Sequence, residues 1–341
     1  MSQRSRLGAI AALAGVIAVA LGLAGTVAPA ARATGGATAT TPGKNGAIAF
    51  RRWLDSSQST GALFTVGASG KGAQQVTRPD SGVEDGSPDW SPDGSLLVFQ
   101  RTGNPYAVYT VTPDGSELQR LTTPDEDASQ ASFLPDGKHF IYTRATGSEK
   151  IFPGDEHWIE HSDLVIRDLT GANPAVVIAS KPWEGDYGSA HFSPDGARLL
   201  YVRQNSPLTK PALGRAIFVA KADGSSRRRI TPWALGAGDD PDWSPDGTLI
   251  LFHSHEDGDA QGQLYVIRPD GKGMRQLTHV KDGTWLGSAS FSPDGKWIAF
   301  AKAGRDGAAD VFVMHADGSG IRPVTHTTLW DSAPDWGAAG R

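Results

Sequence analysis

The sequence predicts an all-β fold, a six-bladed β-propeller with four antiparallel strands in each blade. One short motif, an aromatic residue followed by Ser or Leu, Pro, Asp and Gly, occurs five times, and another aromatic follows each glycine by five residues. A sixth copy is split between the chain ends, with Trp336 in its first half and residues 45–50 in its second. A repeat of roughly fifty residues that is completed only by joining both ends indicates a closed ring. The five continuous motifs begin at Trp90, Phe133, Phe192, Trp243 and Phe291.

Each unit contains four short apolar runs, which we designate strands a to d. In the fifth unit they lie around Trp243 and at residues 249–252, 264–267 and 276–278. Runs this short, and rich in β-branched and aromatic residues, are typical of strands. In the Ser-Pro-Asp-Gly turn between strands a and b, proline presets φ at the second position and glycine accepts a left-handed conformation. Asn45 takes the place of this glycine in the split unit, and Asn also visits the left-handed region.

The turn between strands c and d repeats just as regularly. A glycine lies four residues after each strand c, and seven residues later there is a threonine in five units and Ile178 in the other. These glycines are Gly70, Gly115, Gly171, Gly224, Gly271 and Gly318. The split unit is expected to take strand a from residues 332–336 and its other strands from residues 47–77.

Strand a carries Pro-Asp-Trp in three units and Ala-x-Phe in the other three. Proline lacks the N–H that a central strand needs, so it is tolerated at the edge of a sheet. Strand a is therefore predicted to be the free edge of each blade, lining the central channel.

The first 33 residues are predicted to be a signal peptide. Arg4 and Arg6 form a basic start, residues 7–28 are apolar, and residues 31–33 (Ala-Arg-Ala) match a small-x-small cleavage site. The apolar run approaches membrane-spanning length, so an uncleaved anchor is the alternative. Cleavage leaves a flexible linker at 34–43, the propeller at 44–337 and a tail at 338–341. The mature protein is then expected to be secreted, in the extracellular space or the cell envelope, with no membrane insertion.

Composition excludes several classes of function. The 32 basic and 37 acidic residues give a net charge of −5, and removal of three arginines with the signal peptide makes it −8. This charge argues against a nucleic-acid partner. The chain has no cysteine, so neither disulfides nor a thiolate nucleophile are available.

The W/F-S-P-D-G turns, the x-x-I/L-x-F/Y strands and the D-G-x-x-x-x-x-L-T turns resemble the WD-repeat-like blades of the TolB family and of dipeptidyl peptidase IV-type propellers. The resemblance covers about residues 44–337 and implies the fold, while this repeat serves many unrelated functions. The sequence departs from both families. About ten residues precede the first blade, where TolB carries an α/β domain, and no G-x-S-x-G motif of a hydrolase domain is present.

Loop lengths indicate which face of the ring carries function. The a–b and c–d turns are constant, but the b–c loops on the opposite face span 12, 8, 21, 15, 11 and 10 residues from the first blade to the sixth. Insertions confined to one face of a repeat protein mark its binding surface. The loop of blade three, residues 143–163, contains His157 and Trp158, and the loop of blade five contains His253 and His255.

Carboxylates just before strand a form a second candidate set, expected at the channel mouth on the variable face. A ring of like charges is costly unless a cation lies there, although Asp also favours tight turns for purely structural reasons. Blade six has Trp285 and Leu286 instead. The set comprises Glu84, Asp85, Asp127, Asp186, Asp239 and Asp331.

The favoured function is a non-catalytic, monomeric TolB-like binding protein without a cofactor, whose loop-rich face takes a protein, peptide or glycan. The candidate ligand-binding residues are Asp85, Asp127, Asp186, Asp239, Asp331, His157, Trp158, His253 and His255. The alternative is an exported lyase or hydrolase that uses carboxylates at the channel mouth. It could use a divalent cation held by His253 and His255 with Glu256, His157 or His161.

Overall fold

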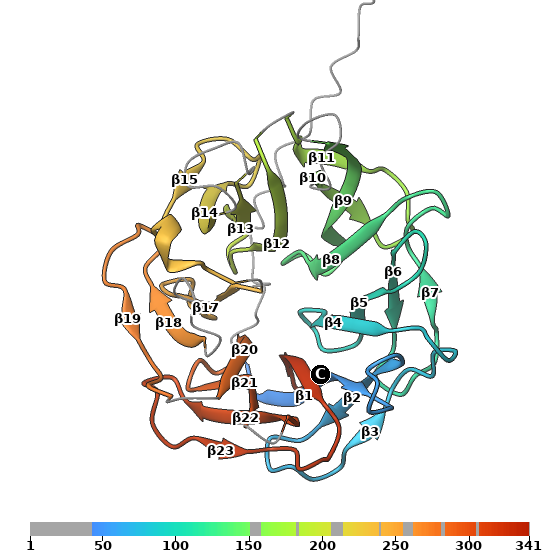
Figure 1. The fold of residues 1–341 in the computed structure, drawn as a ribbon, viewed down its shortest axis with the longest axis vertical. Coiled ribbons are helices and arrows are strands. Elements are labelled where there is room, and N and C mark those ends of the chain that lie inside the picture. Colours follow the sequence, from blue (N-terminus) through green and yellow to red (C-terminus); the bar gives the residue numbers. More distant parts are fainter. Residues whose placement is uncertain are drawn as a thin grey trace, which may run out of the picture. The chain divides into compact units, whose positions relative to one another are not determined.

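A computed structural model of the chain describes residues 43–150, 158–181, 184–205, 214–238, 240–254, 262–280, 284–304 and 307–340. The described residues form six four-stranded antiparallel sheets arranged as blades around a centre (Figure 1). This confirms the predicted six-bladed propeller. In five sheets the strands follow one another in sequence, and in the sixth the last strand of the chain precedes the first.

The strands are short and are assigned to blades in chain order. Blade one contains β24 (Asp331–Ala338), β1 (Asn45–Trp53), β2 (Gly61–Val66) and β3 (Gln74–Gln75). Blade two contains β4 (Asp85–Trp90), β5 (Leu97–Arg101), β6 (Ala107–Val111) and β7 (Gln119–Arg120). Blade three contains β8 (Ala128–Phe133), β9 (His139–Lys150), β10 (Trp158–Asp168) and β11 (Ala175–Ile178).

The second half of the chain repeats this plan. Blade four contains β12 (Asp186–Phe192), β13 (Arg198–Gln204), β14 (Arg215–Lys221) and β15 (Arg228–Arg229). Blade five contains β16 (Asp242–Trp243), β17 (Ile250–Ser254), β18 (Gln263–Ile267) and β19 (Arg275–Gln276), after a 3₁₀ turn at Trp233–Leu235. Blade six contains β20 (Trp285–Phe291), β21 (Trp297–Ala303), β22 (Ala309–His315) and β23 (Arg322–Pro323).

Blade one is closed by the C-terminal strand, as the split repeat predicts. Strand β24 pairs antiparallel with β1, placing Trp336 opposite Ile48 and Asp331 opposite Arg52. Asn45 differs from the expectation that it acts as a turn residue. It pairs with Ala338 without a positive φ, because the chain has no a–b turn to make at this junction.

The repeated turns have the conformations that their glycines imply. Gly94, Gly137, Gly196, Gly247 and Gly295 have φ between 62° and 72°. The threonines after strand d have a common role, since each Oγ1 accepts the N–H of a residue in strand c at 2.9 to 3.1 Å. Blade three has Ile178 instead, and there the longer strand β11 pairs with Leu164.

The hydrophobic core lies between neighbouring blades. One cluster joins Ile48 and Trp336 of blade one to Val311 and Val313 of blade six. The c–d turns reach the preceding blade in the same way. A Cβ on Gly70 would lie 2.6 Å from the carbonyl oxygen of Val324, and a Cβ on four further c–d glycines would lie 2.3 to 2.8 Å from a carbonyl oxygen of the preceding blade.

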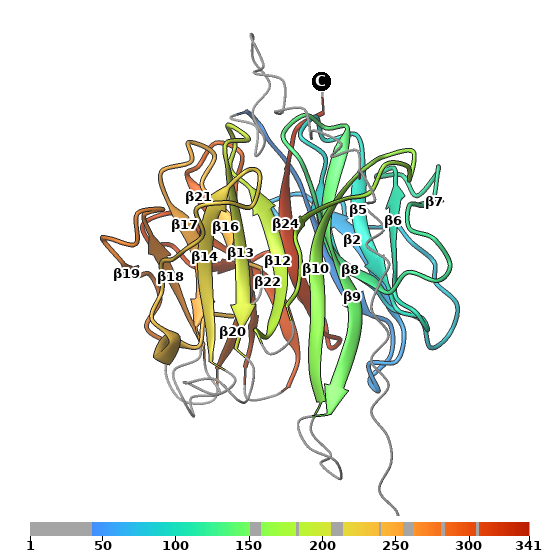
Figure 2. The same cartoon turned by 90° about the horizontal axis from the view of Figure 1, so that it is seen from above.

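Blade three departs from the loop expected over residues 143–163. Strands β9 and β10 continue far beyond the blade, pairing as far as Lys150 and Trp158. Figure 2 shows them extending past the other strands on the face opposite the C-terminus. The polar sequence of this hairpin has no apolar alternation to mark it as strand, so its structure depends on backbone pairing. None of the helical segments in the described ranges has the length and apolar character needed to span a bilayer.

The contact between Gly70 and Val324 tests ring closure. Gly70→Ala and Gly82→Ala both place alanine at a φ near +80°, but the space around Gly82 is open. The shared backbone strain costs about 1–2 kcal/mol. We expect Gly70→Ala to lower the free energy of unfolding by a further ~1–3 kcal/mol, from overpacking against blade six. Urea unfolding measures both variants, and equal losses would contradict closure through this contact.

Candidate functional site

In every blade, the residue before the repeated aromatic of strand a lies at the channel. We call these six residues the channel ring. In order from blade one to blade six they are Asp335, Asp89, Ser132, His191, Asp242 and Ser290. Strand a is at the edge of each sheet, so this ring is built on the free inner edges of the blades (Figure 1).

The three aspartates of the ring link neighbouring blades. Asp335 accepts the backbone N–H of Trp90 at 2.8 Å, and Asp89 accepts that of Phe133 at 2.8 Å. Asp242 accepts the N–H of Phe291 at 2.7 Å. Each carboxylate therefore satisfies a donor on the inner edge of the next blade, which no ladder would satisfy. This requirement explains the Asp in the Pro-Asp-Trp motif.

A β-bulge precedes the ring residue in strand a of five blades, and in blade five Asp240 takes the same left-handed conformation just before β16. The left-handed residue is not glycine in any blade, with φ between 30° and 55°. Such a conformation costs of order 1 kcal/mol or more at each position. All six left-handed residues line a cavity at the channel. The residues are Ala333, Ser87, Gln130, Ser189, Asp240 and Ser288.

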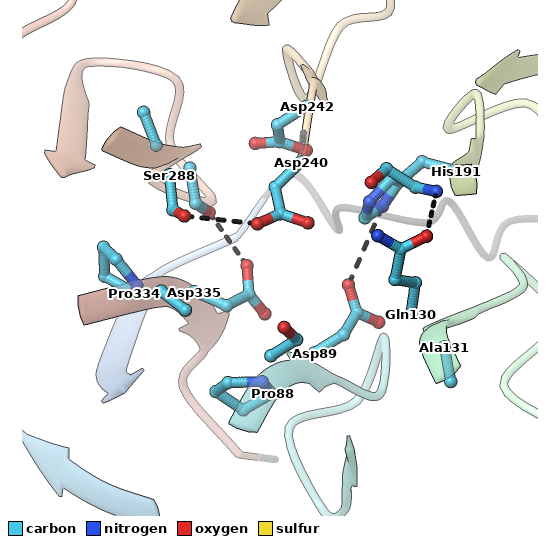
Figure 3. Close-up of a pocket in the computed structure, with 15 residues that line it drawn as sticks. Pro88, Asp89, Gln130, Ala131, His191, Asp240, Asp242, Ser288, Pro334 and Asp335 are labelled. Carbon is cyan, nitrogen blue, oxygen red and sulfur yellow. Dashed lines mark hydrogen bonds and ion pairs between the residues drawn. The ribbon is translucent and has the colours of Figure 1, made fainter. Parts of the chain in front are cut away.

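Two cavities meet at the channel ring. One is lined by the bulge residues (Figure 3). The other is lined by the a–b turns, including Pro92 and Pro293. Asp89, His191 and Asp335 line both, as do Asp242 and Ser290. The ring is thus the boundary between a chamber on the b–c side and one on the turn side.

Like charges and partial removal from water dominate the electrostatics of the ring. Only 19% of the Asp89 side chain is exposed, and burial raises its pKa well above the usual value, helped by the carboxylates of Asp335, Asp242 and Asp240. Burial and Asp335 raise the pKa of Asp242 to about 8. Burial also raises the pKa of Asp335. At neutral pH the protonated form of Asp242 is therefore favoured.

His191 does not neutralise these acids. Its Nδ1 lies 3.9 Å from Asp89 Oδ1, but burial lowers the pKa of the imidazole to about 4. The imidazole is therefore uncharged at neutral pH and adds no positive charge to the ring. Asp335 has a hydroxyl partner in blade six. Ser290 Oγ donates to Asp335 Oδ1 at 2.8 Å and accepts the Trp336 N–H at 3.2 Å.

Two of the carboxylates expected at the channel mouth are neutralised by arginines on the neighbouring strand. Asp85 accepts both Nε and Nη2 of Arg101, at 2.6 and 2.8 Å. Asp331 accepts the same two atoms of Arg52, each at 2.7 Å. Both carboxylates are fully buried. Neither lines the two cavities, so their paired charges hold strands together.

Asp127, Asp186 and His253 lie outside the lining of both cavities. Asp127 is exposed and accepts the Tyr106 N–H at 3.1 Å, while Asp186 accepts the Ser162 hydroxyl. His253 is buried against Gly238. His157, Asp239 and His255 lie outside the described residues, as does the side chain of Trp158. Within the described ranges, no group of three or more acidic or histidine side chains is arranged to hold a metal ion.

Comparison with known proteins shows the family to which the chain belongs. Residues 156–341, more than half of the chain, match the TolB beta propeller domain family. The chain belongs to this family. An uncharacterized protein of Agrobacterium fabrum is 26% identical over 274 residues, which are 74% of this chain and 81% of that protein.

Two further relatives carry the TolB name. The Tol-Pal system protein TolB of Anaeromyxobacter dehalogenans is 26% identical over 295 residues, covering 85% of this chain and 47% of that protein. This TolB-family propeller thus spans about half the length of that relative. The crystal structure of TolB from Acinetobacter baumannii has a TM-score of 0.66 at 17% identity, covering 86% of this chain and 67% of that one. At this level of identity, the similarity to the Acinetobacter baumannii structure shows the fold alone.

Sequence reasoning missed the channel ring of this TolB-family propeller. The aspartates stand between Pro and Trp in three strands that the same reasoning placed at the channel. Alternation along a strand could have found them, because a buried Trp faces the neighbouring blade and the residue before it faces the other way. The bulge before the ring could not be foreseen, since its left-handed residues are Ser, Ala, Gln and Asp.

The protonated ring predicts a pH dependence of stability. The folded state holds a proton on Asp242 that the unfolded chain has released, so stability should fall as pH rises from about 4 to about 8. The slope is about 1.4 kcal/mol per pH unit for each retained proton. Asp242→Asn keeps the acceptor for Phe291 and should flatten the slope, as measured by urea unfolding between pH 5 and 9.

Asp85→Asn is the matched control, because it removes a buried carboxylate that has a cationic partner. This variant should lose stability throughout the range, since Arg101 is left without its anion, and should keep the slope. An Asp242→Asn variant with the slope of the unaltered protein would contradict a protonated ring.

Proposed function

We propose that the mature chain is an exported, non-catalytic binding propeller. It takes a cationic group of a protein or peptide partner, a lysine or arginine side chain, at the channel ring. The partner approaches from the face of the b–c loops. One contrast carries this proposal. Asp85 and Asp331 are paired with arginines, whereas Asp89, Asp242 and Asp335 line the same two cavities at the channel.

The lining of the channel fits a cation. No lysine or arginine is among the described residues that line the chamber on the b–c side. The carboxylates of Asp89, Asp242 and Asp335 are fixed by backbone N–H groups, and Ser290 holds Asp335 further. An ammonium or guanidinium group here would favour the ionised form of these acids, so that binding releases protons from the ring. Binding should therefore strengthen as pH rises.

The relatives support a protein partner over a small molecule. One relative, which matches 85% of this chain, is named Tol-Pal system protein TolB. Its name describes it as a protein of a system. A propeller without catalytic motifs is suited to binding, and an extended segment can reach a narrow channel that a folded surface cannot enter.

Export is part of the proposal and rests on residues 1–33, with their basic start, apolar run and Ala31-Arg32-Ala33 site. Protein recovered from the medium or the cell envelope is expected to begin at or near Thr34, as read by N-terminal sequencing. A membrane-embedded product that retains residues 1–33 would establish an anchor and contradict this part of the proposal.

Binding is tested with a fluorescent glycine-serine peptide that carries one central arginine, against the same peptide with uncharged citrulline. Asp89→Asn with Asp242→Asn should weaken arginine-peptide binding at least about tenfold, roughly 1.4 kcal/mol, and should not change citrulline-peptide binding. Fluorescence anisotropy measures both titrations.

Asp127→Asn with Asp186→Asn makes the same change of charge outside the two cavities and serves as the comparison. We expect a smaller loss from this pair, because neither residue lines the channel. If this pair abolishes binding and the ring pair leaves it intact, the ligand lies over the loops and the channel proposal is wrong.

A further inference from the structure

Strands β9 and β10 project from blade three as a two-stranded ribbon. The pairing of β8 with β9 ends at Ala128 opposite Arg144, and that of β11 with β10 ends at Ile178 opposite Leu164. Strands β9 and β10 continue to pair with each other as far as Lys150 and Trp158 (Figure 2). We call residues 145–150 with residues 158–162 the overhanging ribbon.

The overhanging ribbon has an available edge on β9. The Ala145 N–H is bonded to the Asp127 carbonyl at 2.9 Å. Past this point, no described strand pairs with β9 on the side of β8. An isolated two-stranded ribbon is marginally stable in water, and an open edge is a template for another strand. The backbone of residues 146–150 therefore offers donors and acceptors to an incoming segment.

The opposite edge of the ribbon is approached by this chain itself. After β11, the Ser180 N–H donates to Asp163 Oδ1 at 2.8 Å, and its hydroxyl lies 3.0 Å from Thr146 Oγ1. These contacts place the segment after β11 against the base of the ribbon on the β10 side. The β9 edge is thus the better candidate for a partner.

We propose that residues 146–150 of β9 are a docking edge for an extended segment of a partner polypeptide. The segment adds to the ribbon as a further strand, on the side where β8 lies in the blade. Basic side chains suit this position. By sequence, residues 145–163 contain five acids, Glu149, Asp155, Glu156, Glu160 and Asp163, against one lysine, and of these acids Asp163 is paired with Arg144, at 2.8 Å.

The docking edge leads to the channel. Strand β8 lines the chamber on the b–c side with Gln130 and Ala131, and Gln130 Oε1 accepts the Ser189 N–H across the blade junction at 3.0 Å (Figure 3). A segment laid along β9 in line with β8 therefore points at this chamber. This step rests on the proposed function, since the same partner would then place its cationic side chain at the channel ring.

The probe for this inference is a fluorescent decapeptide of alternating lysine and threonine. Two controls accompany it: the same peptide N-methylated at every second residue, which blocks pairing along one edge, and a glutamate-threonine peptide of opposite charge. The lysine-threonine peptide should bind at least about tenfold tighter than either control. It should also slow amide hydrogen exchange in residues 146–150. Equal affinity for the N-methylated peptide, or unchanged exchange in β9, would overturn the proposal.

A ribbon-deleted variant provides the matched test in the protein. Replacing residues 146–161 by Asn-Gly joins Ala145 to Ser162 through a two-residue hairpin turn. It should lose the preference for the unmethylated peptide. The variant Asp89→Asn with Asp242→Asn should keep the slowed exchange in β9 even if it binds more weakly. Arginine-peptide binding by this variant tests only the proposal for the channel, and exchange in β9 tests only the proposal for the docking edge. The two proposals can therefore be contradicted independently.

Self-association is the remaining outcome. If exchange in residues 146–150 slows with rising protein concentration and no peptide, and sedimentation shows a dimer, then β9 pairs with a second copy of the chain. That result would overturn the docking of a partner segment.

Discussion

The inner edge of each blade imposes the constraint on which this propeller depends. Among the described strands, none pairs with strand a on the channel side, so the backbone donors of strand a need other partners. Asp335, Asp89 and Asp242 meet this need at three junctions by accepting an N–H of the next blade. Cohesion between blades and the acidity of the channel thus have one origin.

This solution has an electrostatic consequence. Carboxylates that bind backbone donors around a narrow channel face one another, and burial raises the pKa of all three. Outside the channel the chain uses arginine for the same purpose, as in the pairs of Asp85 with Arg101 and Asp331 with Arg52. Asp85 and Asp331 are thus paired within their own blades, whereas Asp89, Asp242 and Asp335 line the channel.

The two faces of the ring differ in how strongly the repeat constrains them. On the turn side, a c–d glycine such as Gly70 lies against the preceding blade and leaves no room for a side chain. The b–c loops also touch the next blade, as where the Ala128 N–H donates to the Tyr106 carbonyl at 3.0 Å, but their lengths differ from blade to blade. Blade three shows the extreme case, because β9 and β10 extend past the strands that flank them.

The sequence by itself determined the number of blades, the turns and the closure of blade one. These follow from local chemistry at fixed intervals: proline and glycine set turn dihedrals, and the split motif at Trp336 and Asn45 requires the chain ends to meet. Only the tertiary structure decided which acids line the channel. Asp85 and Asp89 lie four residues apart on one strand, yet one is buried against Arg101 and the other lines the channel. The bulge between them rotates the strand, and its left-handed Ser87 carries no sequence signal. Burial, pairing and the proximity of like charges arise between blades, and residues from six repeats meet there only after the ring has closed.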